Sequence, residues 1–183
     1  MIRKAAMPLP NVTLVLGGAR SGKSAHAERL VEAAAGGGIY LATAEAGDEE
    51  MAERIRRHRD RRGPGWSTVE EPLELARALT ACAAPDRPVL VDCLTLWLSN
   101  VMAAGRETER ESAGLVAALS APNGPVVLVS NEVGLGLVPE TPLGRAFRDE
   151  AGRLNQAVAA VASRVVFVAA GIPLTLKEEE RTE

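Results

Sequence analysis

GGARSGKS, at residues 17–24, consists in order of Gly17, Gly18, Ala19, Arg20, Ser21, Gly22, Lys23 and Ser24. It matches the phosphate-binding pattern G-x-x-x-x-G-K-[ST] at every fixed position, and the apolar run VTLVL leads directly into it. Glycines permit the backbone angles that turn amide N–H groups toward an anion, and a helix after the loop adds the positive end of its dipole. We expect Lys23 to reach the β- and γ-phosphates and the Ser24 hydroxyl to bind Mg²⁺. The segment predicts an enzyme that binds a nucleoside triphosphate.

Short apolar runs alternate with longer helical patterns along the rest of the chain. The apolar runs show no in-and-out alternation, which is typical of strands buried on both faces of a parallel sheet. Strands are expected at residues 12–16, 39–42, 89–92, 126–130 and 165–169, and helices at 22–35, 48–62, 73–83, 94–103, 110–120 and 143–163. After the fifth strand, Gly171 and Pro173 interrupt the chain and leave too few residues for a crossover. Residues 174–177 should therefore form an antiparallel edge hairpin with that strand.

Strand–helix alternation of this kind predicts a three-layer α/β fold. Together with the phosphate loop it indicates a P-loop NTPase (RecA-like) domain, with a mostly parallel sheet and a C-terminal antiparallel edge hairpin. The length of 183 residues suits one domain. We expect that domain to span residues 11–178, with loose ends at 1–10 and 179–183.

The composition argues against several functional classes. A net charge of −3 gives no electrostatic basis for nucleic-acid binding by the chain as a whole. No apolar stretch reaches the roughly 18–20 residues of a membrane span, and the N-terminal residues lack a signal-peptide pattern. Cys82 and Cys93 lie in apolar surroundings without metal-ligand spacing, so we expect buried free thiols in a reducing cytoplasm.

A second acidic element is needed to complete a metal site beside the phosphate loop. The apolar run at residues 88–92 ends in the carboxylate of Asp92, which suits a strand that holds Mg²⁺ through water. The alternative is an ordinary turn residue at the end of a strand. The phosphate loop favours the metal-side role.

The chain has two histidines, and we expect a structural role for His26. His58 follows Met51 and Ile55 at helical spacing, and arginines surround it in the sequence. One interpretation is a solvated basic helix whose histidine packs partly against the core. The other is a neutral, nucleophilic imidazole that attacks a phosphorus atom and forms a covalent phosphoramidate, while the arginines hold the triphosphate. Composition and spacing leave both open.

Several segments, in order along the chain, resemble a single family. They are GGARSGKS, YLATA (40–44), RIRRHRDRRG (54–63), VDCLTLWLSN (91–100), NEVGLGLVP (131–139) and FRDEAGRLNQ (147–156). Together they are similar to the bifunctional adenosylcobinamide kinase/adenosylcobinamide-phosphate guanylyltransferase of cobalamin biosynthesis. The phosphate loop is shared by very many proteins, whereas the last two segments in sequence are specific to this family. The resemblance covers roughly residues 12–177.

The resemblance implies two reactions. The enzyme first phosphorylates a hydroxyl of adenosylcobinamide with GTP or ATP, and then transfers GMP from GTP through a GMP–histidine intermediate, for which His58 is the matching residue. Mg²⁺ is the expected cofactor and a homotrimer the expected assembly. The implied nucleotide contacts are the phosphate loop and Thr43, Ala44, Glu45, Arg59, Asp60, Arg61, Arg62, Glu70 and Asp92.

The chain departs from the family pattern at two positions. Asp92 stands at the end of the third strand where members carry Glu, and Arg57 stands where some members have a second histidine. A P-loop kinase of another small molecule is the main rival to the bifunctional reading. A regulatory GTPase or ATPase switch is the other, and the absence of an N-K-x-D guanine-binding motif counts against it.

Overall fold

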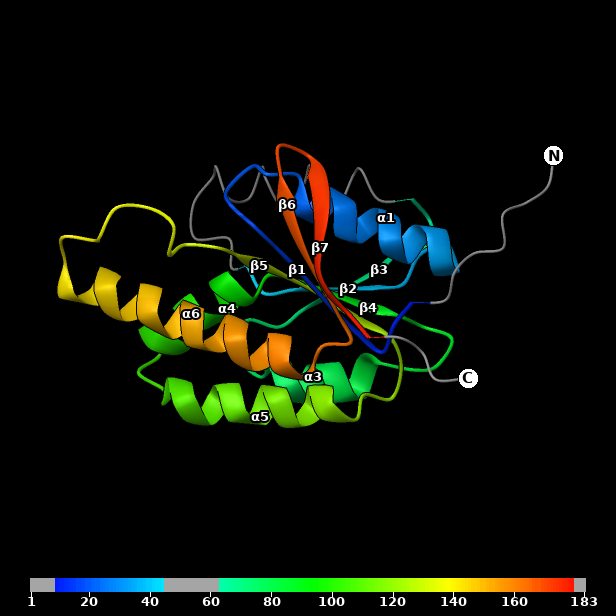
Figure 1. The fold of residues 1–183 in the computed structure, drawn as a ribbon. Coiled ribbons are helices and arrows are strands. Elements are labelled where there is room, and N and C mark those ends of the chain that lie inside the picture. Colours follow the sequence, from blue (N-terminus) through cyan, green and yellow to red (C-terminus); the bar gives the residue numbers. More distant parts are fainter. Residues whose placement is uncertain (1–8, 45–62, 180–183) are drawn as a thin grey trace.

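Residues 9–44 and 63–179 are described by the computed structural model, which Figure 1 shows as a ribbon. They form a seven-stranded sheet in the order β3-β2-β4-β5-β1-β6-β7. Adjacent strands run parallel, except that β7 runs antiparallel to β6. The strands are β1 (Val12–Gly17), β2 (Ile39–Ala42), β3 (Ser67–Glu70), β4 (Val89–Asp92), β5 (Val126–Asn131), β6 (Arg164–Ala169) and β7 (Ile172–Glu178).

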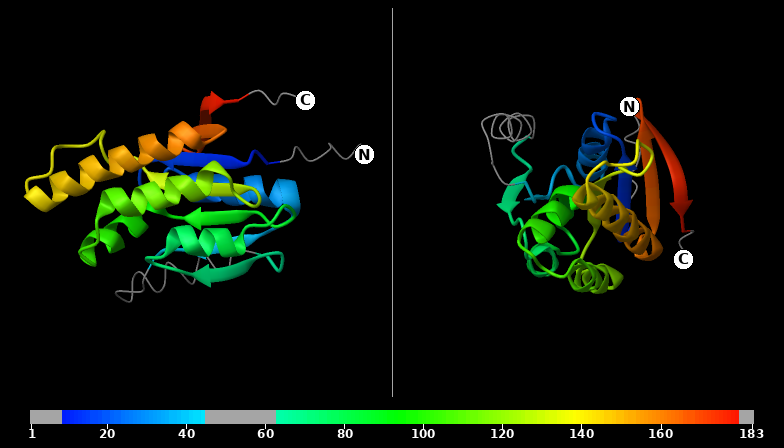
Figure 2. Two further views of the ribbon diagram at one scale, coloured as in Figure 1. Left: turned by 90° about the horizontal axis from the view of Figure 1, so that it is seen from below. Right: turned by 90° about the vertical axis from the view of Figure 1, so that its left-hand side faces the viewer.

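Helices cover the two faces of the sheet unequally, as Figure 1 and Figure 2 show. Within the described residues, α1 (Lys23–Ala35) lies on one face. The opposite face carries α3 (Leu75–Cys82), α4 (Leu94–Ala103), α5 (Thr108–Ser120) and α6 (Pro142–Val161). In the part of the chain that the structure describes, no helix is both long and apolar enough to cross a membrane.

The central strands are apolar throughout because both of their faces are covered. In β5, Val126 and Leu128 pack in the core beneath α3–α6, whereas Val127 and Val129 pack in the core beneath α1. Successive side chains of a strand point to opposite faces, so a strand between two helical layers needs apolar residues at every position. This confirms the expectation of strands at all five apolar runs.

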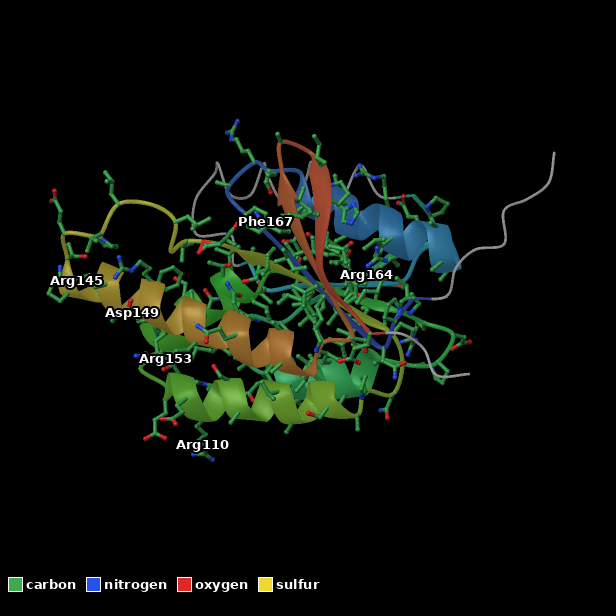
Figure 3. The ribbon with its side chains drawn as sticks, in the orientation of Figure 1. Arg110, Arg145, Asp149, Arg153, Arg164 and Phe167 are labelled. Atoms are coloured by element: carbon green, nitrogen blue, oxygen red, sulfur yellow. The ribbon has the colours of Figure 1, made fainter. Side chains whose placement is uncertain are left out.

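Helix α6 shows the expected apolar stripe. Ala151, Leu154 and Val158 are buried in the core, and Phe147 and Val161 pack partly against it. Its other side is polar: Arg145, Asp149 and Arg153 are exposed and follow one another along the helix in Figure 3. The helix begins after Thr141, whose hydroxyl accepts a hydrogen bond from the Gly144 N–H, with Pro142 in the first helical position.

The edges of the sheet show where sequence patterns succeed and fail. The antiparallel hairpin is confirmed, with β7 beginning at Ile172, earlier than expected. Strand β3 was not expected, because STVE carries only one apolar residue and lies mostly exposed at the other edge. The helix expected at residues 48–62 lies outside the described residues.

We predict that Leu154→Ala lowers the free energy of unfolding by about 2–4 kcal/mol, since it leaves a cavity in the core between α6 and the sheet. The control is Gln156→Ala on the exposed side of the same helix, which should change stability by less than about 0.5 kcal/mol. Urea denaturation of the three proteins measures both. Equal effects of the two substitutions would contradict the packing of α6.

Candidate active site

The glycine-rich segment forms the loop between β1 and α1. Gly22 precedes the helix with φ 95°, and a Cβ there would lie 3.3 Å from the Gly171 Cα, so both conformation and space favour glycine. Lys23 begins α1, is only 8% exposed, and its Nζ donates a 3.0 Å hydrogen bond to the Gly18 carbonyl oxygen. The buried hydroxyl of Ser21 has no hydrogen-bond partner within residues 9–44 and 63–179. A buried polar atom left unpaired suits a loop whose hydrogen bonds are completed by an anion.

Two neighbouring segments fix the loop through its backbone. The Glu132 N–H donates to the Gly17 carbonyl oxygen at 3.1 Å, and the Gly171 N–H donates to the Ser21 carbonyl oxygen at 2.8 Å. A Cβ on Gly17 would lie 2.5 Å from the Val168 carbonyl oxygen, so no side chain fits at the start of the loop. The loop is therefore held from both sides by segments distant in the sequence.

The described residues that the resemblance implicates in nucleotide binding share one edge of the sheet. Gly17, Glu70 and Asp92 end β1, β3 and β4, and Thr43 and Ala44 follow β2. Adjacent strands lie about 4.8 Å apart, so Asp92, two strand positions from β1, is about 10 Å away across the sheet. Glu70 is four positions, or about 19 Å, from β1. By this spacing Glu70 lies far along the edge from the start of the phosphate loop.

Asp92 is oriented by a neighbouring strand. The Tyr40 hydroxyl donates a 2.9 Å hydrogen bond to Asp92 Oδ2, which leaves the other carboxylate oxygen available. The Ser24 hydroxyl and the Asp92 carboxylate are hard oxygen donors of the kind that Mg²⁺ binds. Among the described residues no group of three or more His, Cys, Asp and Glu could hold a metal. The donor set fits a Mg²⁺ ion that takes most of its ligands from phosphates and water.

Thr43 is fully buried, and all of its polar groups are used within the protein. Its N–H donates to the Asp92 carbonyl oxygen, and its hydroxyl both donates to the Cys93 carbonyl oxygen at 2.7 Å and accepts from the Cys93 N–H at 2.8 Å. Asn100 Nδ2 donates to the Thr43 carbonyl oxygen at 2.8 Å and to the Pro72 carbonyl oxygen at 3.2 Å. Thr43 thus ties the turns after β2 and β4 together.

The two cysteines are free thiols; Cys93 is buried as expected, and Cys82 is only half-buried. Burial raises the pKa of the Cys93 thiol to about 11, and the negative charge of Asp92 adds to this effect. The positive charge of Lys23 lowers the pKa of the thiol, so the charges of both Lys23 and Asp92 lie close to it. Cys93 is protonated at neutral pH and is not a nucleophile.

His26 lies on α1, where its buried Nε2 finds no hydrogen-bond partner in the part of the chain that the structure describes. Burial lowers the pKa of His26, and the positive charges of Arg29 and Arg164 lower it further. Both effects favour the neutral form of the imidazole.

The structure adds residues to this edge that sequence patterns had assigned no role. Asn131 ends β5 and Glu132 follows it, next to Gly17. Thr95, in the first turn of α4, accepts a hydrogen bond from the Asn131 N–H. The signal available in the sequence was the pair Asn131-Glu132 directly after a buried strand. Six of the predicted site residues lie outside the described part of the chain: Glu45, His58, Arg59, Asp60, Arg61 and Arg62.

The parallel sheet and its loop between β1 and α1 define a P-loop NTPase fold, as predicted. The flagellar accessory protein FlaH from Methanocaldococcus jannaschii is similar with a TM-score of 0.53 and 11% identity, over 94% of this chain and 80% of that one. A protein of Pyrococcus horikoshii OT3 is similar with a TM-score of 0.50 and 11% identity, over 96% and 90% of the two chains. At this identity the likeness concerns the fold alone.

A family model described as cobinamide kinase / cobinamide phosphate guanyltransferase matches residues 13–176, and the chain belongs to this family of bifunctional transferases. The bifunctional adenosylcobalamin biosynthesis protein CobP of Pseudomonas aeruginosa is 49% identical over 91% of this chain and 97% of its own length. The bifunctional adenosylcobalamin biosynthesis protein CobU of Salmonella typhimurium is 43% identical over 90% and 98%. These matches confirm the resemblance read from the sequence.

We predict that the Cys93 thiol makes the protein less stable at alkaline pH. The folded protein holds the thiol proton more tightly than the unfolded chain, so this stabilisation is complete below pH 9 and is lost as the pH rises toward 11. A shift of this size corresponds to about 3 kcal/mol in full. Urea denaturation against pH should show a steeper loss for the wild type than for Cys93→Ala. Parallel curves for the two proteins would refute it.

Proposed function

We propose that this protein phosphorylates the hydroxyl on the aminopropanol arm of adenosylcobinamide and then transfers GMP from GTP to the new phosphate. The observation that carries the proposal is the family match over residues 13–176, which includes an intact phosphate loop. The names of the CobP and CobU relatives, both described as bifunctional, support the same pair of reactions. Mixing adenosylcobinamide, GTP and Mg²⁺ and separating the phosphate from the GDP derivative tests it directly.

In the kinase step, the phosphate loop holds the triphosphate of ATP or GTP. Its backbone N–H groups and the Lys23 ammonium bind the β- and γ-phosphates, and the fixed backbone orients the γ-phosphorus for in-line attack by the acceptor hydroxyl. Ser24 and Asp92 would hold Mg²⁺, which neutralises charge that develops on the phosphates. The close packing around Gly17 and Gly22 keeps these groups in position before the substrate arrives.

In the guanylyltransfer step, a nitrogen of His58 attacks the α-phosphorus of GTP. The bond from that phosphorus to the bridging oxygen breaks, and pyrophosphate leaves. An oxygen of the cobinamide phosphate then attacks the same phosphorus, the phosphorus–nitrogen bond breaks, and the histidine is regenerated. In addition to the phosphate loop, the residues that we propose to contact the GTP of this step are Ala44, Glu70 and those near the nucleophile: Glu45, Arg59, Asp60, Arg61 and Arg62.

The span of the sheet edge supports two modes of nucleotide contact. Glu70 and the phosphate loop lie about 19 Å apart by strand spacing, too far for both to contact one phosphate group. The phosphate-loop end therefore suits γ-phosphoryl transfer, and the β2–β3 end suits binding of the guanosine part or of a second nucleotide. Thr43 contributes by fixing the turn after β2.

We predict that His58→Ala abolishes the covalent adduct formed with α-labelled GTP, because the nucleophilic nitrogen is lost, while kinase activity toward adenosylcobinamide remains. Lys23→Ala should lower the rates of both steps by at least about 100-fold, since both use the bound triphosphate. Acid-labile, alkali-stable label on the protein, together with γ-label on the corrinoid, measures the two steps separately. Protein-bound label in His58→Ala would falsify the assignment of the nucleophile.

We also propose that the protein assembles as a homotrimer. Among the described residues, large apolar side chains are exposed in three places: Leu135, Leu137 and Val138 in the segment between β5 and α6, Leu143 at the start of α6, and Ile172, Leu174 and Leu176 on β7. Leu137 is 96% exposed, which is costly for an isolated chain in water. Burial between subunits removes that cost, since interfaces bury apolar side chains that a monomer would leave in contact with water.

The assembly predicts a molar mass in solution three times that of the 19.2 kDa chain. Leu137→Glu and Leu174→Glu should shift the mass toward the monomer, because a charge buried at an interface is destabilising. Arg153→Glu, on the exposed side of α6, is the control. Light scattering after size-exclusion chromatography gives the mass, and a monomeric wild type would rule out the trimer.

A further inference from the structure

Asn131 occupies a position that the reactions above leave without a role. It is the last residue of β5 and the register partner of Gly17, the first residue of the phosphate loop. Its backbone is fixed on both sides: the N–H donates to Thr95 Oγ1 at 2.7 Å, and the carbonyl oxygen accepts from Asn155 Nδ2 at 3.3 Å. Its side-chain amide has no hydrogen-bond partner among the described residues and is partly exposed.

The alternation of side chains along β5 places Asn131 on the α1 face of the sheet. Val127 and Val129 pack in the core beneath α1, so Asn131, two residues further, is on the same face. Asp92 is on this face as well. Leu90, two residues before it, packs in the same core, as does Tyr40, whose hydroxyl donates to the Asp92 carboxylate. The free amide and the carboxylate thus share the face from which α1 begins.

The sheet order places this amide between the two groups that define the phosphate site. Strand β5 lies between β4, which ends in Asp92, and β1, which leads into the loop. Asn131 is level with Gly17, about 4.8 Å away across the sheet, and lies two residues beyond Val129, the register partner of Asp92. In P-loop proteins the loop lysine and the metal ion both contact the β- and γ-phosphates, and the γ-phosphate is the terminal group that the acceptor attacks. The amide at the end of β5 therefore lies on the same edge and face as the groups expected to bind these phosphates.

We propose that the Asn131 side chain contacts the γ-phosphoryl group during the kinase step, a role that rests on the proposed function. Its NH₂ group donates to a phosphoryl oxygen, and its carbonyl oxygen accepts from the attacking hydroxyl of the acceptor. The acceptor oxygen bonds to the γ-phosphorus, the bond to the β–γ bridging oxygen breaks, the nucleoside diphosphate leaves, and the hydroxyl proton passes to water. Asn131 itself takes up no proton.

An uncharged amide suits this position on electrostatic grounds. Asp92 and Glu132 already provide negative charge at this edge, so a further carboxylate at Asn131 would repel the phosphate. The hydrogen bond that the Asn131 N–H donates to Thr95 and the one that its carbonyl oxygen accepts from Asn155 hold the backbone, so the amide starts from a fixed main chain. Thr95 is 7% exposed and contacts Ser130, 2% exposed, which keeps this support rigid.

The test compares Asn131→Ala and the isosteric Asn131→Asp with the wild type. We expect the kinase kcat to fall by about 100-fold in Asn131→Ala and further in Asn131→Asp. Formation of the covalent GMP adduct from GTP, and the melting temperature, should stay near wild-type values. The control is Asn123→Ala, an exposed asparagine before β5 whose amide donates to the Thr80 carbonyl oxygen, which should change neither step.

The two enzymatic steps provide an internal check. An unchanged kinase kcat in Asn131→Ala overturns the proposal, as does an equal fall in kinase and adduct formation, which would indicate a structural role. If Asn131→Ala does not fold, the isosteric Asn131→Asp decides between the same outcomes. A wild type without kinase activity would instead contradict the proposed function, so the two failures are distinguishable.

Discussion

Strand β1 pairs in parallel with β5 on one side and with β6 on the other, and the position of the phosphate loop follows from this pairing. A loop whose amide N–H groups must converge on an anion cannot also be free to move, because ordering it on binding would cost conformational entropy. Hydrogen bonds from Glu132 to Gly17 and from Gly171 to Ser21 continue the pairing beyond the strand ends. The contacts around Gly17 are so close that no side chain fits. Sheet pairing therefore preorganises the site.

Polar groups along the carboxyl edge of the sheet divide into two sets. Thr43, Thr95 and Asn100 are engaged with backbone groups of neighbouring turns, so their hydrogen bonds maintain the frame of the site. The Ser21 hydroxyl and the Asn131 amide lack protein partners in the described structure. A buried hydroxyl such as that of Ser21 is costly when unpaired, which suits a position that a ligand completes.

The same edge can serve two chemistries because it is wide. Attack at a γ-phosphorus and attack at an α-phosphorus need different groups in line with the reacting atom, and one set of fixed side chains cannot satisfy both. Parallel strands place polar residues side by side at about 4.8 Å intervals, which spreads the candidate contacts from Gly17 to Glu70. Cys93 is held protonated beside Asp92 and Lys23, so its thiol does not compete as a nucleophile with the residues named above.

The amino-acid sequence by itself determined the features that depend on local chemistry. The phosphate loop can be predicted because its glycines, lysine and serine act within one turn. Strands β1, β2, β4, β5 and β6 can be predicted because burial on both faces requires apolar residues throughout. Strand β3 was missed because an exposed edge strand such as STVE makes no such demand. The family could be recognised from NEVGLGLVP and FRDEAGRLNQ, but these segments do not by themselves indicate which residues they contact. Only the tertiary structure decided the strand order, the internal role of Thr43 and the place of Asn131 beside Gly17. Those depend on hydrogen bonds between residues distant along the chain, which no local periodicity records.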